Sequence, residues 1–260
     1  MKVSRKLNFL MLEYWYAFPF ATLVSTFAMI TGGEGAILFV PFFILIGLDP
    51  GSAVGTAFIT QLFGKSSGTI GYIRTGGIQK NIVALLVFAG APTIVIGSYI
   101  TSALKSWLLQ FVFGMATIAL SLIMLYSLKK RESTREDVQS HEIFPKLWIP
   151  SVAGLLTGIF AVGAGTINLV FLERMMGLRM HKAVATVVAA MAFTAIAGAL
   201  VHIYSGEVFW HIAIFTIAGV LVGGQIGPRL AKRMESRRIK ELFVFLTYVV
   251  GSVMCMTALL

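Results

Sequence analysis

The chain has 260 residues, of which 57% are hydrophobic and only 12% are charged, and its mean hydropathy is +0.87. A water-soluble domain carries about 25% charged residues, so this composition excludes a soluble enzyme and indicates an integral membrane protein. The net charge of +10 is typical of lysine and arginine on cytoplasmic loops, so no nucleic-acid partner is expected. The single cysteine, Cys255, cannot form an internal disulfide.

Apolar runs follow one another along the whole chain and predict membrane helices or half-helices. In chain order they are 17–31, 36–48, 53–73, 82–104, 107–128, 147–162, 166–178, 183–204, 211–230 and 242–260. The polar stretch 129–146 divides them into two halves, and we expect it to be a linker rather than a domain.

The two halves repeat with an offset of 130 residues, and no gap is needed between residues 33 and 97. Internal duplication of this kind is typical of many transporter folds. Matching pairs include Gly33 and Gly163, Gly35 and Gly165, Gly47 and Gly177, Thr56 and Thr186, Phe63 and Phe193, and Gly97 and Gly227.

Each half begins with two runs that are too short to span a bilayer. About 15 helical residues reach only about 22 Å of a hydrocarbon core of about 30 Å. We therefore predict re-entrant hairpins at about 17–48 and 147–178, with three spanning helices after each hairpin. Three crossings per half is an odd number, so the second half must be inverted. The predicted fold is an all-α membrane protein with two inverted repeats, 1–128 and 147–260, joined by a cytoplasmic linker, 129–146.

The distribution of basic residues agrees with this topology. The loops 74–80, 129–146, 174–182 and 229–240 fall on one side and hold 16 of the 21 lysines and arginines. By the positive-inside rule this side is cytoplasmic, and both termini are then external. The basic N-terminus, with Lys2, Arg5 and Lys6, is the exception to the rule.

The two predicted hairpin tips form the first candidate site. Glycines leave backbone N–H groups open to a ligand, and a helix begins after each tip with its positive dipole end toward the membrane centre. Two inverted hairpins bring these ends together, which predicts a site for a small anion. Tight helix packing is the alternative reason for the glycines. The tip residues are Gly32, Gly33, Glu34 and Gly35 in the first half and Gly163, Ala164 and Gly165 in the second.

Lys65 is the one basic residue predicted inside the membrane, in the middle of the run 53–73. A charge at that depth costs about 2.5 kcal/mol or more and marks a functional residue. Two roles are open for it: it binds the substrate anion, or it only pairs with Glu34. The carboxyl group of Glu34 can itself carry a coupling proton. Gln61 lies one turn before Lys65 on the same helix face and joins the predicted substrate site.

Three weaker candidates complete the predicted substrate site: Asn168, Thr56 and Thr186. The two threonines match across the repeat, although hydrogen bonds to their own helix backbone would explain them equally well. No metal-ligand spacing and no protease, hydrolase or P-loop signature is present, so no catalytic residue, metal or cofactor is expected. The expected partners are a small anionic substrate, a coupling proton or sodium ion, and membrane lipids, with a homodimer left open.

A family resemblance rests on the repeated glycine-rich pattern. The first copy consists of 32–35, Val40-Pro41, Gly47-Leu48 and 53–56, and the second of 163–165, 183–186 and 224–227. This pattern resembles the sulfite exporter TauE/SafE family, including its 4-toluene sulfonate uptake permease group, over about residues 17–258. The chain departs from the family pattern at Glu34, Ala164, Phe171 and Ala185, and the acid at the first tip changes the charge that an anion meets.

The resemblance implies a multi-pass permease of the cell inner membrane that moves sulfite or an organosulfonate such as sulfoacetate. We therefore predict a secondary transporter in which one repeat moves against the other. A passive anion channel is the alternative. An intramembrane enzyme acting on a lipid is a further alternative, but it would need acids or histidines clustered at membrane depth, where only Glu34 qualifies. The exact anion and the direction of transport are left open.

Overall fold

The computed structural model describes residues 14–75, 77–128 and 134–259. Within them the chain is helical except for one isolated bridge between Arg135 and Leu178. The first half contains α2 (Ala17–Thr31), α3 (Ala36–Leu45), α4 (Pro50–Thr75), α5 (Lys80–Ala103) and α6 (Ser106–Leu128). The second contains α7 (Ser140–Ile143), η1 (Phe144–Lys146), α8 (Trp148–Phe160), α9 (Ala164–Val170), η2 (Phe171–Met175), α10 (Met180–Tyr204), α11 (Trp210–Ala231) and α12 (Ser236–Leu259).

The described helices confirm an all-helical, multi-span membrane protein. Five of them, α5, α6, α10, α11 and α12, are long and apolar enough to cross a membrane. The sequence predicted a sixth span at 53–73, but α4, with 26 residues, does not reach that apolarity. The physical reason is its polar middle, where Gln61, Lys65, Ser66 and Ser67 follow closely. A different sixth candidate is the pair Ser140–Lys146 and Trp148–Phe160, which is bent by 62°.

The described part of the predicted linker contains structure that the sequence did not indicate. The helix α7 begins with a capping box between Gln139 and Glu142, and Arg135 forms an ion pair of 2.8 Å with Glu142. The linker residues Lys129, Lys130 and Arg131, like the N-terminal Lys2, Arg5 and Lys6, lie outside the described residues.

Each half starts with a short helix that meets a second short helix at a glycine turn. The first turn has Gly32 and Gly33 at φ 110° and 91°, and the second has Gly163 at φ 125°. These left-handed angles are unfavourable for residues with a Cβ. In the first half α3 runs back along α2, as the contact between Phe42 of α3 and Phe20 of α2 shows, with ring centroids 4.0 Å apart. Residues 31–37 and 161–166 are all buried, so both turns lie inside the protein.

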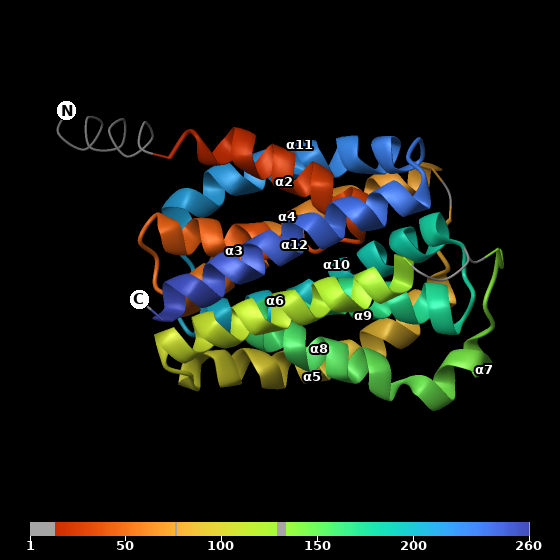
Figure 1. Cartoon of the computed structure of the whole chain (residues 1–260), viewed down its shortest axis with the longest axis horizontal. Coiled ribbons are helices and arrows are strands. Elements are labelled where there is room, and N and C mark those ends of the chain that lie inside the picture. The colour runs from red at the N-terminus through yellow and green to blue at the C-terminus, as the bar shows by residue number, and fades with distance from the viewer. Residues whose placement is uncertain (1–13, 76, 129–133, 260) are drawn as a thin grey trace.

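The helices pack in pairs that cross between the two halves. The helix α2 packs on α11, and its repeat counterpart α8 packs on α5. In the same way α4 packs on α11 and α10 on α5, while α4 contacts α10 and α6 contacts α12 (Figure 1). Glycines allow these close contacts: a Cβ at Gly219 would overlap the backbone of α2, and a Cβ at Gly97 would overlap that of α8.

The four basic loops meet at one end of the bundle. Gln79 hydrogen-bonds the backbone of Glu136, Lys182 contacts the same residue, and Arg135 bonds the backbone of Gly177. Figure 1 shows the loop between α11 and α12 at this end as well, while the start of α2 and the end of α12 lie at the opposite end.

Candidate functional site

The carboxylate of Glu34 reaches from the first tip into the second. Its Oε1 accepts hydrogen bonds from the backbone N–H groups of Gly163 at 3.0 Å and Thr166 at 2.9 Å. The side chain is 1% exposed, and Oε2 has no hydrogen-bond partner within the described structure. A Cβ at Gly165 would lie 2.7 Å from the Cγ of Glu34, so only glycine fits there. The backbone of the second tip therefore binds a carboxylate supplied by the first.

Lys65 and Gln61 lie beside this contact and line a small cavity together with Gly33 and Gly35. The cavity measures about 10 Å³, which is room for about one water molecule. Lys65 is 3% exposed, and no hydrogen bond or ion pair within 4 Å joins its ammonium to another described residue. It interacts electrostatically with the carboxylate of Glu34. A buried lysine that lines a cavity and has no direct partner for its ammonium is suited to bind a small anion.

Gln61 connects this cavity to the second hairpin. Its Nε2 lies 3.4 Å from the backbone oxygen of Ala161, the residue at which α8 ends in a left-handed conformation. The Oε1 atom of Gln61 is buried and has no partner among the described residues. Unpaired buried polar atoms are uncommon in folded proteins, and they mark places where water or a ligand completes the bonding.

A second cavity of about 10 Å³ contains Asn168 and occupies the equivalent place in the other half. Three of its lining residues correspond to residues of the first cavity by the offset of 130. The Oδ1 atom of Asn168 is buried without a partner in the described structure, as is the Oε1 of Gln61. The corresponding pairs are Val220 and Gly90, Gln61 and Met191, and Gly64 and Thr194.

The structure places Thr56 and Thr186 away from the tips, where both make the same backbone contact. The Oγ1 of Thr56 accepts from the N–H of Phe209 at 3.0 Å, and the Oγ1 of Thr186 accepts from the N–H of Gln79 at 3.1 Å. Phe209 and Gln79 are the residues that precede α11 and α5. The two threonines thus fix the starts of two equivalent helices.

The other predicted site residues lie at the two tips and their cavities. They include Gly33, Glu34, Gly35, Gln61, Lys65, Gly163, Gly165 and, in the second cavity, Ala164 and Asn168.

One buried charged cluster was not predicted from the sequence. Glu173 and Lys240 are 1% and 2% exposed and form an ion pair of 2.5 Å. Arg174 lies 3.4 Å from Glu173 and donates to Ser127. The cluster ties the π-helix η2 to α6 and α12. An acid and a base inside the apolar run 166–178 were the available signal, but sequence position alone suggested a loop.

The comparisons with known proteins agree with this architecture. Residues 17–254 match the family described as Sulfite exporter TauE/SafE. The chain belongs to this family. Among curated relatives, "Probable membrane transporter protein YunE" of Bacillus subtilis (strain 168) is 22% identical over 252 residues, which cover 88% of this chain and 92% of the relative. "Probable membrane transporter protein ORF9" of Sinorhizobium sp is 27% identical over 236 residues, or 87% of each chain.

A third relative, a "Probable membrane transporter protein" of Haemophilus influenzae, is 21% identical over 235 residues and covers 89% of this chain and 90% of its own. No solved structure matches the chain significantly. Membership of the TauE/SafE family makes the protein a membrane transporter and not an enzyme.

Proposed function

We propose that this TauE/SafE protein is a secondary transporter for a small sulfur-containing anion, sulfite or an organosulfonate such as sulfoacetate, in the cell inner membrane. The observation that carries the proposal is Lys65, which is buried beside the first tip, lines the cavity there and has no hydrogen bond or ion pair to its ammonium among the described residues. Such a charge is retained at membrane depth only where it has a function. The family description, which names a sulfite exporter, supports the sulfur-containing class of anion.

In this proposal the anion binds between Lys65 and the backbone of the first tip. A Cβ at Gly33 would lie 3.8 Å from the Cε of Lys65, so the lysine side chain runs along the tip. Glu34 repels an incoming anion unless it is protonated or stays bound to the second tip. Its partner-free Oε2 is where a coupling proton can bind, which makes a proton the favoured coupling ion over sodium.

The size of the cavity supports a carrier rather than a channel. A sulfonate group has four heavy atoms, whereas the cavity has room for about one water. The two halves must therefore move apart before the anion can bind. The crossed helix pairs, α2 with α11 and α8 with α5, support two inverted repeats that rock against each other to give alternating access.

The topology of the proposal places the end that carries the linker in the cytoplasm. Cysteine variants at Asp137 and Arg237, both largely exposed, are expected to react with a membrane-impermeant reagent from the same side in a Cys255→Ser background. A cysteine at Lys105 is expected to react from the other side. Labelling of positions 137 and 237 from opposite faces would contradict the inverted repeat.

The function itself is tested by counterflow in liposomes that contain the purified protein. Vesicles loaded with unlabelled sulfite should accumulate [35S]sulfite transiently against its gradient, because a carrier exchanges substrate and a channel does not. The same assay with sulfoacetate, taurine, sulfate and acetate as internal anions ranks the substrates. Equilibration without overshoot would favour the passive channel, and exchange of acetate alone would reject the sulfur-containing class.

A further inference from the structure

A larger cavity opens at the end of the bundle where the basic loops meet. It measures about 410 Å³ and is separate from the two cavities at the tips. Basic side chains from two helices surround it, and a single acid, Glu136, lies among them. We call this cavity the basic mouth. Its lining consists of Tyr72, Gly77, Glu136, Arg179, His181, Lys182, Pro228 and Lys232.

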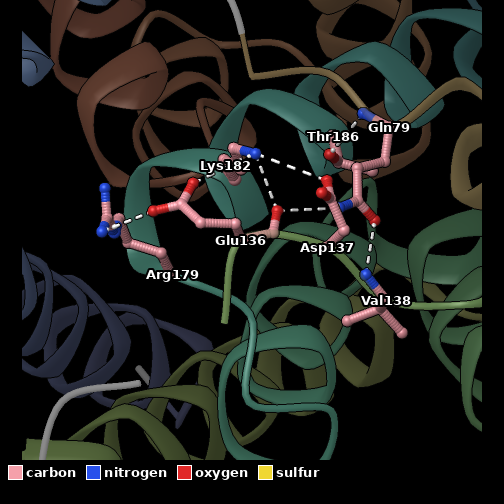
Figure 2. Close-up of polar contacts among 7 residues, drawn as sticks. All are labelled: Gln79, Glu136, Asp137, Val138, Arg179, Lys182 and Thr186. Atoms are coloured by element: carbon pink, nitrogen blue, oxygen red, sulfur yellow. Dashed lines mark hydrogen bonds and ion pairs between the residues drawn. The ribbon is translucent and has the colours of Figure 1, made fainter. Parts of the chain in front are cut away.

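The carboxylate of Glu136 lies between two of these basic side chains (Figure 2). It forms ion pairs with Arg179 at 2.5 Å and with Lys182 at 3.1 Å, and Lys182 pairs in addition with Asp137 at 3.4 Å. Lys232, by contrast, forms no ion pair within the described residues. The mouth therefore has more basic groups than its own acid neutralises.

The backbone around Glu136 is held over the mouth by Gln79. The Nε2 of Gln79 donates to the backbone oxygen of Glu136 at 3.1 Å and to Asp137 at 2.9 Å, and its Oε1 accepts from the N–H of Val138 at 3.3 Å (Figure 2). Gln79 is itself fixed through its N–H to Thr186. The carboxylate of Glu136 is thus positioned among the basic groups by the residue that precedes α5.

Only a thin layer separates the mouth from the cavity of Lys65. Tyr72 lines the mouth, and its hydroxyl donates a hydrogen bond of 2.5 Å to the backbone oxygen of Met29. Met29 lines the cavity that contains Lys65. An anion in the mouth would therefore lie one contact away from the proposed transport site.

We propose that the basic mouth is a second anion-binding site, which holds the transported anion on the linker side. In this proposal the carboxylate of Glu136 competes with the anion for the same basic side chains. The inference rests on the proposed function. Without substrate, the carboxylate neutralises Arg179 and Lys182; with substrate, the oxyanion takes its place. Glu136 belongs to the linker, which occurs once in the chain. Competition by its carboxylate therefore affects anion binding at one end of the transporter only.

The exposure of these groups sets the expected size of the effect. The side chains of Arg179 and Glu136 are 54% and 48% exposed, and ion pairs between exposed groups are weak and screened by salt. Glu136 is therefore easily displaced. Removing it should change the apparent affinity by about two- to fivefold rather than by orders of magnitude.

The test measures the KM for [35S]sulfite from each side of the membrane, in vesicles whose orientation is established by labelling at position 237, outside the mouth. Glu136→Gln should lower the KM on the linker side by about two- to fivefold at low salt, with the difference lost at high salt. Lys232→Gln should raise the KM on that side. Glu235→Gln and Arg238→Gln are matched controls, since both residues are exposed at the same end and lie outside the mouth.

The outcomes separate this inference from the proposed function. If the wild type transports sulfite while both mouth variants behave like their controls, or if their KM changes are equal from both sides, the mouth is not a substrate site. If the wild type neither binds nor moves any anion of the panel, both proposals fail. A side-specific change in opposite directions for Glu136→Gln and Lys232→Gln supports the inference.

Discussion

The two hairpin tips share a backbone plan but differ in chemistry. Each is a buried glycine turn before a short helix, and each lies beside a cavity of about 10 Å³. The first tip supplies charged and polar side chains, whereas the second supplies backbone N–H groups that bind one of them. At equivalent positions the first and second halves have Glu34 and Ala164, Gln61 and Met191, and Lys65 and Ala195.

The comparison separates residues that are equivalent in both halves and hold the helices together from residues that occur in one half and form the proposed site. The helix pairs and the threonine contacts are the same in both halves, because they hold the scaffold. At the tips the buried charges occur in the first half only, which fits the proposal that the anion binds a single ammonium there. A second buried lysine would add a desolvation cost without a partner. The predictions below use this contrast between equivalent positions.

The largest effect is expected for Gly165→Val. Its Cβ would lie 2.7 Å from both the Cγ of Glu34 and the backbone oxygen of Gly32, so the two tips would have to separate. We expect transport to be lost and the free energy of unfolding to fall by about 3 kcal/mol or more. Gly51→Ala is the control, because the added Cβ would meet only two side-chain carboxylates, those of Asp49 at 3.3 Å and Glu207 at 3.7 Å. Normal transport by well-folded Gly165→Val would show that the tips need not touch.

A large effect on affinity is expected for Lys65→Met. Removing one partner of a buried, charged contact costs about 2–5 kcal/mol, or roughly 30-fold or more in affinity. The KM for sulfite should rise accordingly. Lys105→Met removes a lysine that is exposed and should leave the KM unchanged. A change of less than about threefold for Lys65→Met would place the anion elsewhere.

Glu34→Ala is expected to act mainly on stability. It leaves the N–H groups of Gly163 and Thr166 without their acceptor, at a cost of about 1–3 kcal/mol for each group. Thermal unfolding should therefore occur at a clearly lower temperature, and added sulfite should stabilise the variant more than the wild type. A substitution at the equivalent position of the second tip, Ala164→Ser, should change neither the unfolding temperature nor the stabilisation by sulfite appreciably. Equal melting temperatures for Glu34→Ala and the wild type would reject the contact between the tips.

The smallest effects, and equal ones, are expected for Thr56→Val and Thr186→Val. Both side chains are fully buried and accept one backbone hydrogen bond of nearly the same length. Each variant should lose about 1 kcal/mol of unfolding free energy and keep its affinity for sulfite. A loss of sulfite affinity in only one of the two variants would indicate that the substituted threonine belongs to the substrate site.

The sequence predicted the helices well because their apolar runs are long and their polar breaks are clear. The bounds of α2 match the predicted run 17–31, and most other described helices differ from their runs by a few residues. The exceptions are α12, which begins at Ser236, well before its run 242–260, and the run 166–178, which is divided between α9 and η2. The sequence was less informative where polarity depends on tertiary partners. The polar middle of α4, around Lys65, is accommodated by packing inside the protein, and Glu173 and Lys240 are buried together although each has a charged, loop-like sequence neighbourhood.

The candidate site was predicted in part for the same reason. Glycines and a lone lysine at membrane depth are visible in the sequence, so the tips, Glu34 and Lys65 were all candidates. Sequence alone could not show that Glu34 binds the opposite tip, since this contact joins residues 129 positions apart. The sequence also could not show that Thr56 and Thr186 each accept a hydrogen bond from the residue that precedes a distant helix, and their place in the substrate site stays a prediction.

Sulfite affinity of the double variant Lys65→Met/Glu34→Gln tests the central claim most directly. If Lys65 binds the anion, the double variant should melt near the wild-type temperature, because no lone charge remains buried, and yet bind sulfite at least about 30-fold more weakly. If Lys65 only neutralises Glu34, the double variant should recover both stability and affinity. A double variant that binds and transports sulfite like the wild type would contradict an anion site between the two tips.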